Sequence, residues 1–117
     1  MSDALVIRRT GTFGRVAVLH VEGRLDAKTA IQLRERGAAV AAEGRNLILN
    51  LSGVTFLGST GLGALLALSE EFQEQAGEVR IAEPSAAARE VIELVSLDRV
   101  VQIDPDEASA LKLMQAA

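Results

Sequence analysis

Two adjacent hydroxyl residues, Ser59 and Thr60, lie where a hydrophobic strand pattern gives way to a helical one. The N-terminus of a helix presents unpaired N–H groups and the positive end of the helix dipole, and both favour an anion. A phosphate on Ser59 would therefore be partly stabilised there. Because Gly61 and Gly63 carry no side chains, another protein could approach the first helical turn closely. These features are compatible with a phosphorylatable docking surface.

The same residues also have a purely structural interpretation. Ser59 could cap the helix, its hydroxyl oxygen accepting a hydrogen bond from the Leu62 N–H, an interaction that contributes about 1 kcal/mol. Asp26 follows a strand pattern and precedes a helical one, so plain N-capping would account for it as well. The residue types by themselves leave both interpretations open.

The strands that must position these residues are marked by short apolar runs. They are expected at residues 5–7, 16–21, 47–51, 79–82 and 100–103. The first two should form an antiparallel hairpin with its turn at residues 11–14. The third is apolar enough to lie at the centre of the sheet, and residues 52–58 should form a short loop after it.

Four helical patterns alternate with these strands. They are expected from Asp26 to about residue 42, from Ser59 or Thr60, from Pro84 and Ser85, and from about Glu107. Gly44 and Gly77 should end the first two helices. Pro84 suits a first-turn position, and Asp104 or Asp106 should cap the last helix.

This alternation predicts an α/β fold with a mixed sheet. One antiparallel hairpin should be followed by parallel strands joined through right-handed crossovers. About four helices should pack mainly on one face of the sheet. A chain of 117 residues fits one compact domain, spanning residues 1–117, that needs no metal or disulfide for a core.

Composition argues against several classes of function. The chain has no cysteine, so disulfides and thiolate metal sites are excluded. With three Phe and no Trp or Tyr it lacks base-stacking platforms, and at a net charge of −4 its basic residues are scattered, so no nucleic-acid partner is expected. His20, the only histidine, is interpreted as structural. Without a Cys/His pair, a metal-ligand cluster or a Walker-type loop, neither an enzyme nor a cofactor is expected.

No membrane segment is predicted. Residues 1–4 lack the basic start and the apolar stretch of a signal peptide. No apolar run approaches the roughly 20 residues that span a bilayer. We therefore expect a cytoplasmic protein without direct membrane insertion.

Four blocks of the sequence resemble the STAS family, and specifically its anti-sigma factor antagonists. Residues 21–26 (VEGRLD) resemble the G-x-L-D opening of that family's first helix. Residues 47–62 resemble the strand and loop that lead into its phosphorylation motif, usually Asp-Ser-Ser/Thr-Gly-Leu. Residues 83–98 resemble its third helix, and residues 104–113 the acidic start of its last one. The resemblance covers nearly the whole chain in the right order.

The resemblance implies partner switching. The unphosphorylated antagonist binds an anti-sigma factor, itself a GHKL-type serine kinase, and so frees the sigma factor. The kinase phosphorylates the antagonist with ATP and the complex breaks, and a PP2C-type phosphatase reverses this. Ser59 matches the phosphoacceptor, with Thr60 as its neighbour and a less favoured acceptor. Gly61 matches the motif glycine, and Asp26 the acidic residue beside the site.

One position departs from the family pattern, because Gly58 stands where Asp usually precedes the acceptor. The change keeps the acceptor hydroxyl but removes a local negative charge. It leaves open an alternative in which the domain is a non-phosphorylated STAS subunit, for example of a lipid-asymmetry ABC transporter, and binds an ATPase subunit with the same helix start. In either case the expected partner-binding residues are Asp26, Gly58, Ser59, Thr60, Gly61, Leu62 and Gly63.

Overall fold

The computed structural model describes residues 5–115. Residues 1–4, where no signal peptide is expected, lie outside the described part. The elements follow the predicted order, with one additional 3-10 turn. They are β1 (Val6–Phe13), β2 (Val16–Leu25), α1 (Ala30–Ala42), β3 (Asn46–Leu57), α2 (Ser59–Glu74), β4 (Val79–Ala82), α3 (Ala86–Leu94), the 3-10 turn η1 (Leu97–Arg99), β5 (Gln102–Asp104) and α4 (Glu107–Gln115).

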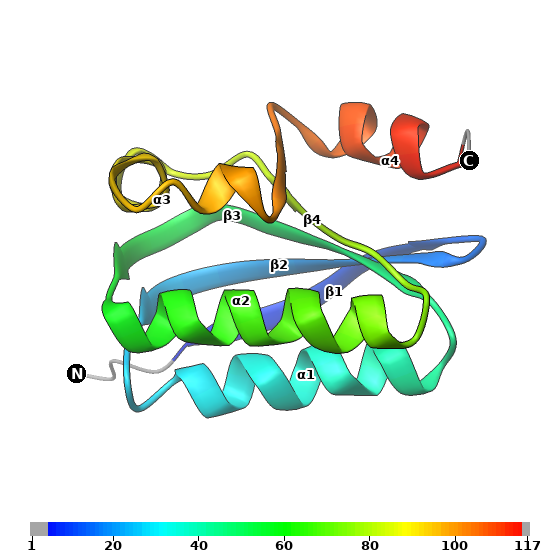
Figure 1. Ribbon diagram of the computed structural model, residues 1–117, viewed down its shortest axis with the longest axis horizontal. Helices are drawn as coiled ribbons and strands as arrows, with labels where there is room; N and C mark the ends of the chain where they lie inside the picture. The colour runs from blue at the N-terminus through cyan, green and yellow to red at the C-terminus, as the bar shows by residue number, and fades with distance from the viewer. Residues whose placement is uncertain (1–4, 116–117) are drawn as a thin grey trace.

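The sheet has five strands in the order β1-β2-β3-β4-β5. Strands β1 and β2 are antiparallel, and every later neighbour pair is parallel, as predicted (Figure 1). The hairpin turn lies at Gly14 and Arg15, later than predicted. Gly11 instead lies inside β1 beside a register shift, while Gly14 adopts the positive φ of 61° that the tight turn requires.

Strand β3 is longer than the sequence suggested. Residues 52–57, predicted as loop, remain paired with β2 as far as the Leu25–Leu57 pair. Two register shifts in this ladder accommodate the extension. Since the end of β2 supplies the partner, the strand continues through residues whose local preference is for a turn. The linker between β3 and α2 is therefore reduced to Gly58.

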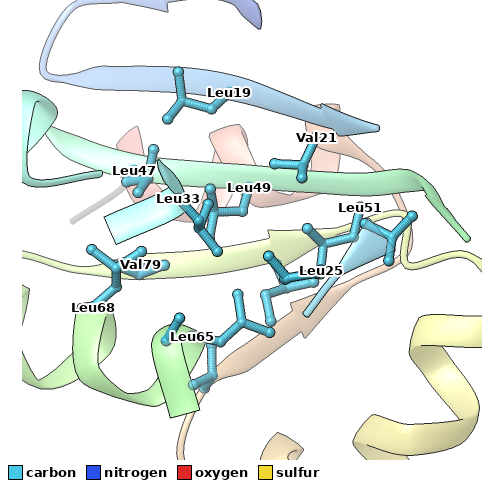
Figure 2. Packing of buried hydrophobic residues seen from close by; sticks show 14 of the residues in the cluster. Leu19, Val21, Leu25, Leu33, Leu47, Leu49, Leu51, Leu65, Leu68 and Val79 are labelled. Atoms are coloured by element: carbon cyan, nitrogen blue, oxygen red, sulfur yellow. The ribbon is translucent and has the colours of Figure 1, made fainter. Parts of the chain in front are cut away.

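The main hydrophobic core lies between the sheet and helices α1, α2 and α3. Figure 2 shows aliphatic side chains of β2 and β3, including Leu19 and Leu49, facing Leu33 of α1 and Leu65 of α2. Alternate residues of the same strands point to the other face, where α4 covers a smaller cluster with Ala110 and Met114. Figure 1 shows α1 and α2 on one side of the sheet and α4 on the opposite side. The expectation of helices mainly on one face is confirmed.

The two long helices end in similar motifs, one of which was predicted correctly. Gly44, at φ 74°, ends α1, and its N–H donates to the Ala41 carbonyl. At the end of α2 the left-handed residue is Ala76, at φ 60°, and Gly77 follows it. The Gly77 N–H closes the motif by donating to the Phe72 carbonyl at 2.7 Å. The left-handed residue that ends α2 is therefore Ala76, one residue before the predicted Gly77.

The later elements differ from the predictions mainly at their ends. Ser85 is the N-cap of α3 and accepts a hydrogen bond from the Ala88 N–H, so Pro84 precedes the cap instead of lying in the first turn. Asp106 accepts from the Ser109 N–H at 2.7 Å and caps α4.

Strand β5 begins two residues later than the predicted 100–103. The N–H groups of Val100 and Val101 are used by η1, because both donate to the Leu97 carbonyl at 3.0 Å. Only from Gln102 onward does the chain pair with β4.

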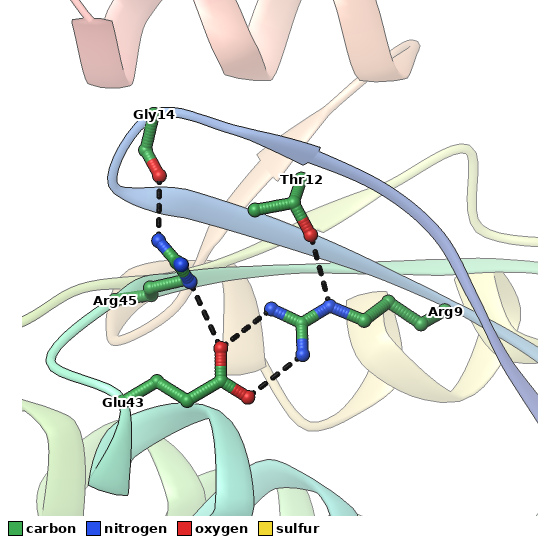
Figure 3. A network of polar contacts seen from close by, with 5 residues as sticks. All are labelled: Arg9, Thr12, Gly14, Glu43 and Arg45. Carbon is green, nitrogen blue, oxygen red and sulfur yellow. Dashed lines mark hydrogen bonds and ion pairs between the residues drawn. The ribbon is translucent and has the colours of Figure 1, made fainter.

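A network of charged side chains connects β1, the end of α1 and the β1–β2 turn at one end of the molecule (Figure 3). Both carboxylate oxygens of Glu43, just after α1, accept from the Arg9 guanidinium of β1 at 2.7 Å. Arg45 donates to the same carboxylate and to the Gly14 carbonyl, each at 2.8 Å. Within residues 5–115, no helix is both long enough and apolar enough to cross a membrane.

Candidate functional site

Ser59 is the first residue of α2 and is exposed, as is Thr60. The helix is preceded by Gly58 in an extended conformation, whose carbonyl accepts the Leu62 N–H at 2.9 Å. Ser59 is therefore not the N-cap, and the structural interpretation in which its hydroxyl receives the Leu62 N–H is wrong. The first N–H groups of a helix have no acceptor within the helix, and at the start of α2 no side-chain cap supplies one.

The helix start is fixed by the end of strand β2. The Gly58 N–H donates to the Leu25 carbonyl at 3.0 Å. A Cβ atom on Gly61 would lie 2.5 Å from the same carbonyl oxygen, so only glycine allows this approach. Gly63, by contrast, has nothing within 4 Å of a Cβ position and faces open space. Leu62, between them, packs partly against the main core.

Asp26 lies next to Leu25 but does not open α1. The helix begins at Ala30, and Asp26 closes the turn before it by accepting hydrogen bonds from the Lys28 N–H at 3.0 Å and the Thr29 N–H at 3.2 Å. The prediction of a helix from Asp26 was therefore four residues early. Burial opposes ionisation of this carboxyl, but the hydrogen bonds from Thr29 and Lys28 outweigh it and lower the pKa of Asp26.

A cleft of about 370 Å³ lies between the first turns of α1 and α2. It is lined by Ala27, Ala30, Ile31, Arg34, Thr60, Gly63 and Ala64. Ile31 is 64% exposed, although it is a large apolar side chain. Arg34, which lines the cleft, is paired with Glu71 of α2. The cleft thus offers apolar contact directly beside the two hydroxyl residues.

Sequence reasoning missed a second feature at this edge of the sheet. Arg24, at the end of β2, places its guanidinium 4.2 Å from the centroid of the Phe56 ring. The ring edge in turn lies against Gly58, since a Cβ there would be 3.0 Å from Phe56 Cε2. Residues 24 and 56 are cross-strand neighbours, a relation that only the parallel register of β2 and β3 reveals.

His20, which the sequence analysis interprets as structural, lies away from this edge. Its Nε2 atom is 3.1 Å from Ser52 Oγ, and its Nδ1 atom is 3.2 Å from Glu22 Oε1. The ring therefore links β2 to β3 through polar neighbours. The residues brought together at the helix start are Asp26, Gly58, Ser59, Thr60, Gly61, Leu62 and Gly63, joined by Arg24 and Phe56.

Known proteins match both the sequence and the fold. A model of the STAS domain family matches residues 8–110. RsfB of Mycobacterium tuberculosis, an anti-sigma-F factor antagonist, is 37% identical over 89 residues, which make up 75% of this chain and 72% of RsfB. The crystal structure of an anti-sigma factor antagonist from Mycobacterium paratuberculosis superposes with a TM-score of 0.86 at 30% identity, covering 98% of this chain and 97% of that one.

The fold is also that of SpoIIAA, an anti-sigma factor antagonist whose structure is known in two states. The unphosphorylated form superposes with a TM-score of 0.79 at 21% identity, covering 96% of this chain and 98% of SpoIIAA. The phosphorylated form, from Bacillus, superposes with a TM-score of 0.70 at 22% identity, covering 93% and 99%. From the family match over residues 8–110 and the relatives that share its length and fold, the chain belongs to the STAS domain family.

Proposed function

We propose that this protein is an anti-sigma factor antagonist that binds an anti-sigma factor of the GHKL serine-kinase type. Reversible phosphorylation of Ser59, removed by a PP2C-type phosphatase, would switch the binding off. The observation that carries the proposal is the exposed Ser59 hydroxyl on the first residue of α2, where it performs no capping role. The names of the relatives, which are anti-sigma factor antagonists, support the same role.

The physical basis of the switch is a change of charge on a surface built for close contact. Phosphorylation adds about −1.5 to −2 charges. Beside open Gly63 and the apolar cleft, a partner that packs on the helix start would have to desolvate this charge. An unpaired, desolvated charge costs several kcal/mol, enough to weaken binding by about a thousandfold.

Intact mass after incubation with the cognate kinase and ATP tests the modification. The unaltered protein and Thr60→Ala should gain about 80 Da, the mass of one phosphoryl group, whereas Ser59→Ala should gain nothing. Thr60→Ala is the matched control, because Thr60 is the next residue of α2 and is also exposed. A gain of mass by Ser59→Ala would assign the modification to another residue.

Calorimetric titration with the same kinase tests the switch. Ser59→Ala should bind as tightly as the unaltered protein, because the Ser59 hydroxyl contributes no cap that the substitution would remove. Ser59→Asp should bind at least about tenfold more weakly, because it places one charge on the contact surface. Equal affinities of the alanine and aspartate variants would contradict the charge-based switch.

A second candidate function is favoured by Gly58. The family pattern has Asp there, but a side chain at this position would meet the Phe56 ring at 3.0 Å. A STAS subunit that is never phosphorylated, for example in a lipid-asymmetry ABC transporter, would use the same helix start to bind an ATPase subunit. Unchanged mass in the presence of a kinase that phosphorylates a control antagonist would support this alternative.

A further inference from the structure

Arg24 and Phe56 form a small exposed platform beside the α2 start. Phe56 as a residue is 39% exposed, and the Arg24 side chain is 46% exposed. With the guanidinium 4.2 Å from the ring centroid, the pair has the geometry of a cation–π interaction. Stacking restricts the flexible arginine side chain, so less conformational freedom is lost when its N–H groups meet an acceptor.

The platform is fixed relative to Ser59 by the backbone. Arg24 and Phe56 are paired across the parallel strands β2 and β3, and the next pair joins Leu25 to Leu57. The ring edge contacts Gly58, the residue immediately before Ser59. A protein that covers the α2 start from the side of Gly58 therefore also meets the exposed ring and the guanidinium above it.

Within residues 5–115, the N–H groups of the Arg24 guanidinium donate no hydrogen bond, although the side chain forms an ion pair with Asp26. Its nearest acidic neighbour is Asp26, and the Arg24 Nε atom lies 3.7 Å from Asp26 Oδ2, too far for a hydrogen bond. The other oxygen of Asp26 is engaged by the N–H groups of Lys28 and Thr29. Arg24 thus presents several N–H donors at a surface where arginine and aromatic side chains together are characteristic of binding hot spots.

We propose that the Arg24–Phe56 platform is a specificity-determining part of the docking surface, and that it binds a carboxylate-bearing patch on the anti-sigma factor. The inference rests on the proposed function, because it names the chemistry of that same partner. With glycine at position 58, two charged side chains stand at the end of β2. The Asp26 carboxylate accepts hydrogen bonds from the turn before α1, whereas the Arg24 cation stacks on Phe56 and keeps N–H donors for a partner. A partner complementary to this surface must offer Asp or Glu side chains, since carboxylates match the planar guanidinium in a bidentate manner.

The test is the affinity of the unphosphorylated protein for its cognate anti-sigma factor, measured by titration calorimetry. Arg24→Gln should raise the Kd by about tenfold or more, and Arg24→Glu should raise it further. Phe56→Leu should also weaken binding, and a double-mutant cycle should show that the effects of Arg24→Gln and Phe56→Leu are not additive. Salt should weaken binding of the unaltered protein more steeply than binding of Arg24→Gln.

Arg15→Gln is the matched control. Arg15 is an exposed arginine just before the first residue of β2, whereas Arg24 is near its last. The two are about 30 Å apart along the strand, so this control should bind like the unaltered protein. Urea denaturation checks that all variants are folded.

Two outcomes separate the platform from the proposed function. If the unaltered protein binds and Arg24→Glu binds equally tightly, the platform inference is overturned while the proposed function stands. If the unaltered protein does not bind an active anti-sigma factor, the proposed function fails and the platform inference fails with it.

Discussion

At the scale of single residues, Gly61 and Gly63 lie two positions apart on α2 but serve different purposes. A methyl group on Gly61 would press on the Leu25 carbonyl at 2.5 Å, whereas one on Gly63 would meet nothing. Gly61→Ala should therefore lower the free energy of unfolding by about 1–2 kcal/mol, the strain exceeding the gain in helix propensity. Gly63→Ala should raise it by roughly 0.5–1 kcal/mol. Urea denaturation measures both, and a loss of stability in Gly63→Ala would contradict the assignment.

The open surface at Gly63 makes a separate prediction about binding. Because Gly63 lines the cleft with Thr60 and Ala64, a methyl group there occupies space that a docked partner would use. Gly63→Ala should therefore weaken binding to the anti-sigma factor by about tenfold or more while stabilising the helix. Alanine at this position with undiminished affinity would place the docking surface elsewhere.

The residue-level parts of the site differ in how far the sequence could reveal them. The hydroxyl pair and the glycines form one short segment, so local patterns were enough to predict an exposed helix start. Arg24 and Phe56 are separated by 32 positions and meet only through the strand register. No local pattern encodes that contact, and for this reason it was not predicted.

At the scale of elements, the ends of α1 and α2 provide a matched pair of substitutions. Both helices end with a left-handed residue, which is Gly44 after α1 and Ala76 after α2. Since alanine in this conformation is strained by about 1–2 kcal/mol and glycine is not, Ala76→Gly should stabilise the protein by roughly 0.5–1 kcal/mol. Gly44→Ala should destabilise it by about 1 kcal/mol, although nothing lies within 4 Å of its Cβ position.

Urea denaturation checks these effects on the helix ends. The variants should share one slope of unfolding free energy against urea concentration, so that a shifted midpoint reports a change in stability. Gly63→Ala provides the control, since Gly63 has no positive φ and nothing lies within 4 Å of its Cβ position. Changes of the same sign in Ala76→Gly and Gly44→Ala would show that side-chain contacts, and not backbone conformation, determine stability at these positions.

The elements themselves could be predicted in type and order but not in their limits. Apolar periodicity in each segment determines whether it becomes strand or helix, and every predicted element is found. The extension of β3 through residues 52–57 depends on pairing with the end of β2. Tertiary pairing overrides the local turn preference of Ser52 and Gly53, which explains why this stretch was predicted as a loop.

At the scale of the whole molecule, the proposed binding surface and the charged network around Glu43 lie at opposite ends of the sheet. The helix start, the cleft and the Arg24–Phe56 platform gather where β2 and β3 end, at the left of Figure 1. The network around Glu43 lies at the other end, where it joins β1, the hairpin turn and the end of α1 (Figure 3). Changes in the network should therefore alter stability while leaving binding unaffected.

The Glu43 network also predicts how stability depends on pH. Hydrogen bonds from Arg9 and then Arg45 lower the pKa of Glu43 from 4.5 to about 2 in the folded protein. As the pH falls from 4.5 towards 2, Glu43 binds a proton in the unfolded chain but stays ionised in the folded protein. The unfolded state is therefore stabilised relative to the folded state. The contribution of Glu43 is thus fully present above pH 4.5 and disappears as the pH approaches 2.

Glu43→Gln should accordingly reduce the fall in unfolding free energy between these two pH values, as measured by urea denaturation across the interval. High salt should shrink the difference from the unaltered protein, because the Glu43 and Arg9 side chains are 36% and 32% exposed and their attraction is screened. Glu90→Gln on α3, an exposed glutamate without an ion pair in residues 5–115, is the control. If the unfolding free energy of Glu43→Gln fell with pH as steeply as that of Glu90→Gln, the acid dependence would have to come from carboxylates outside the Glu43 network.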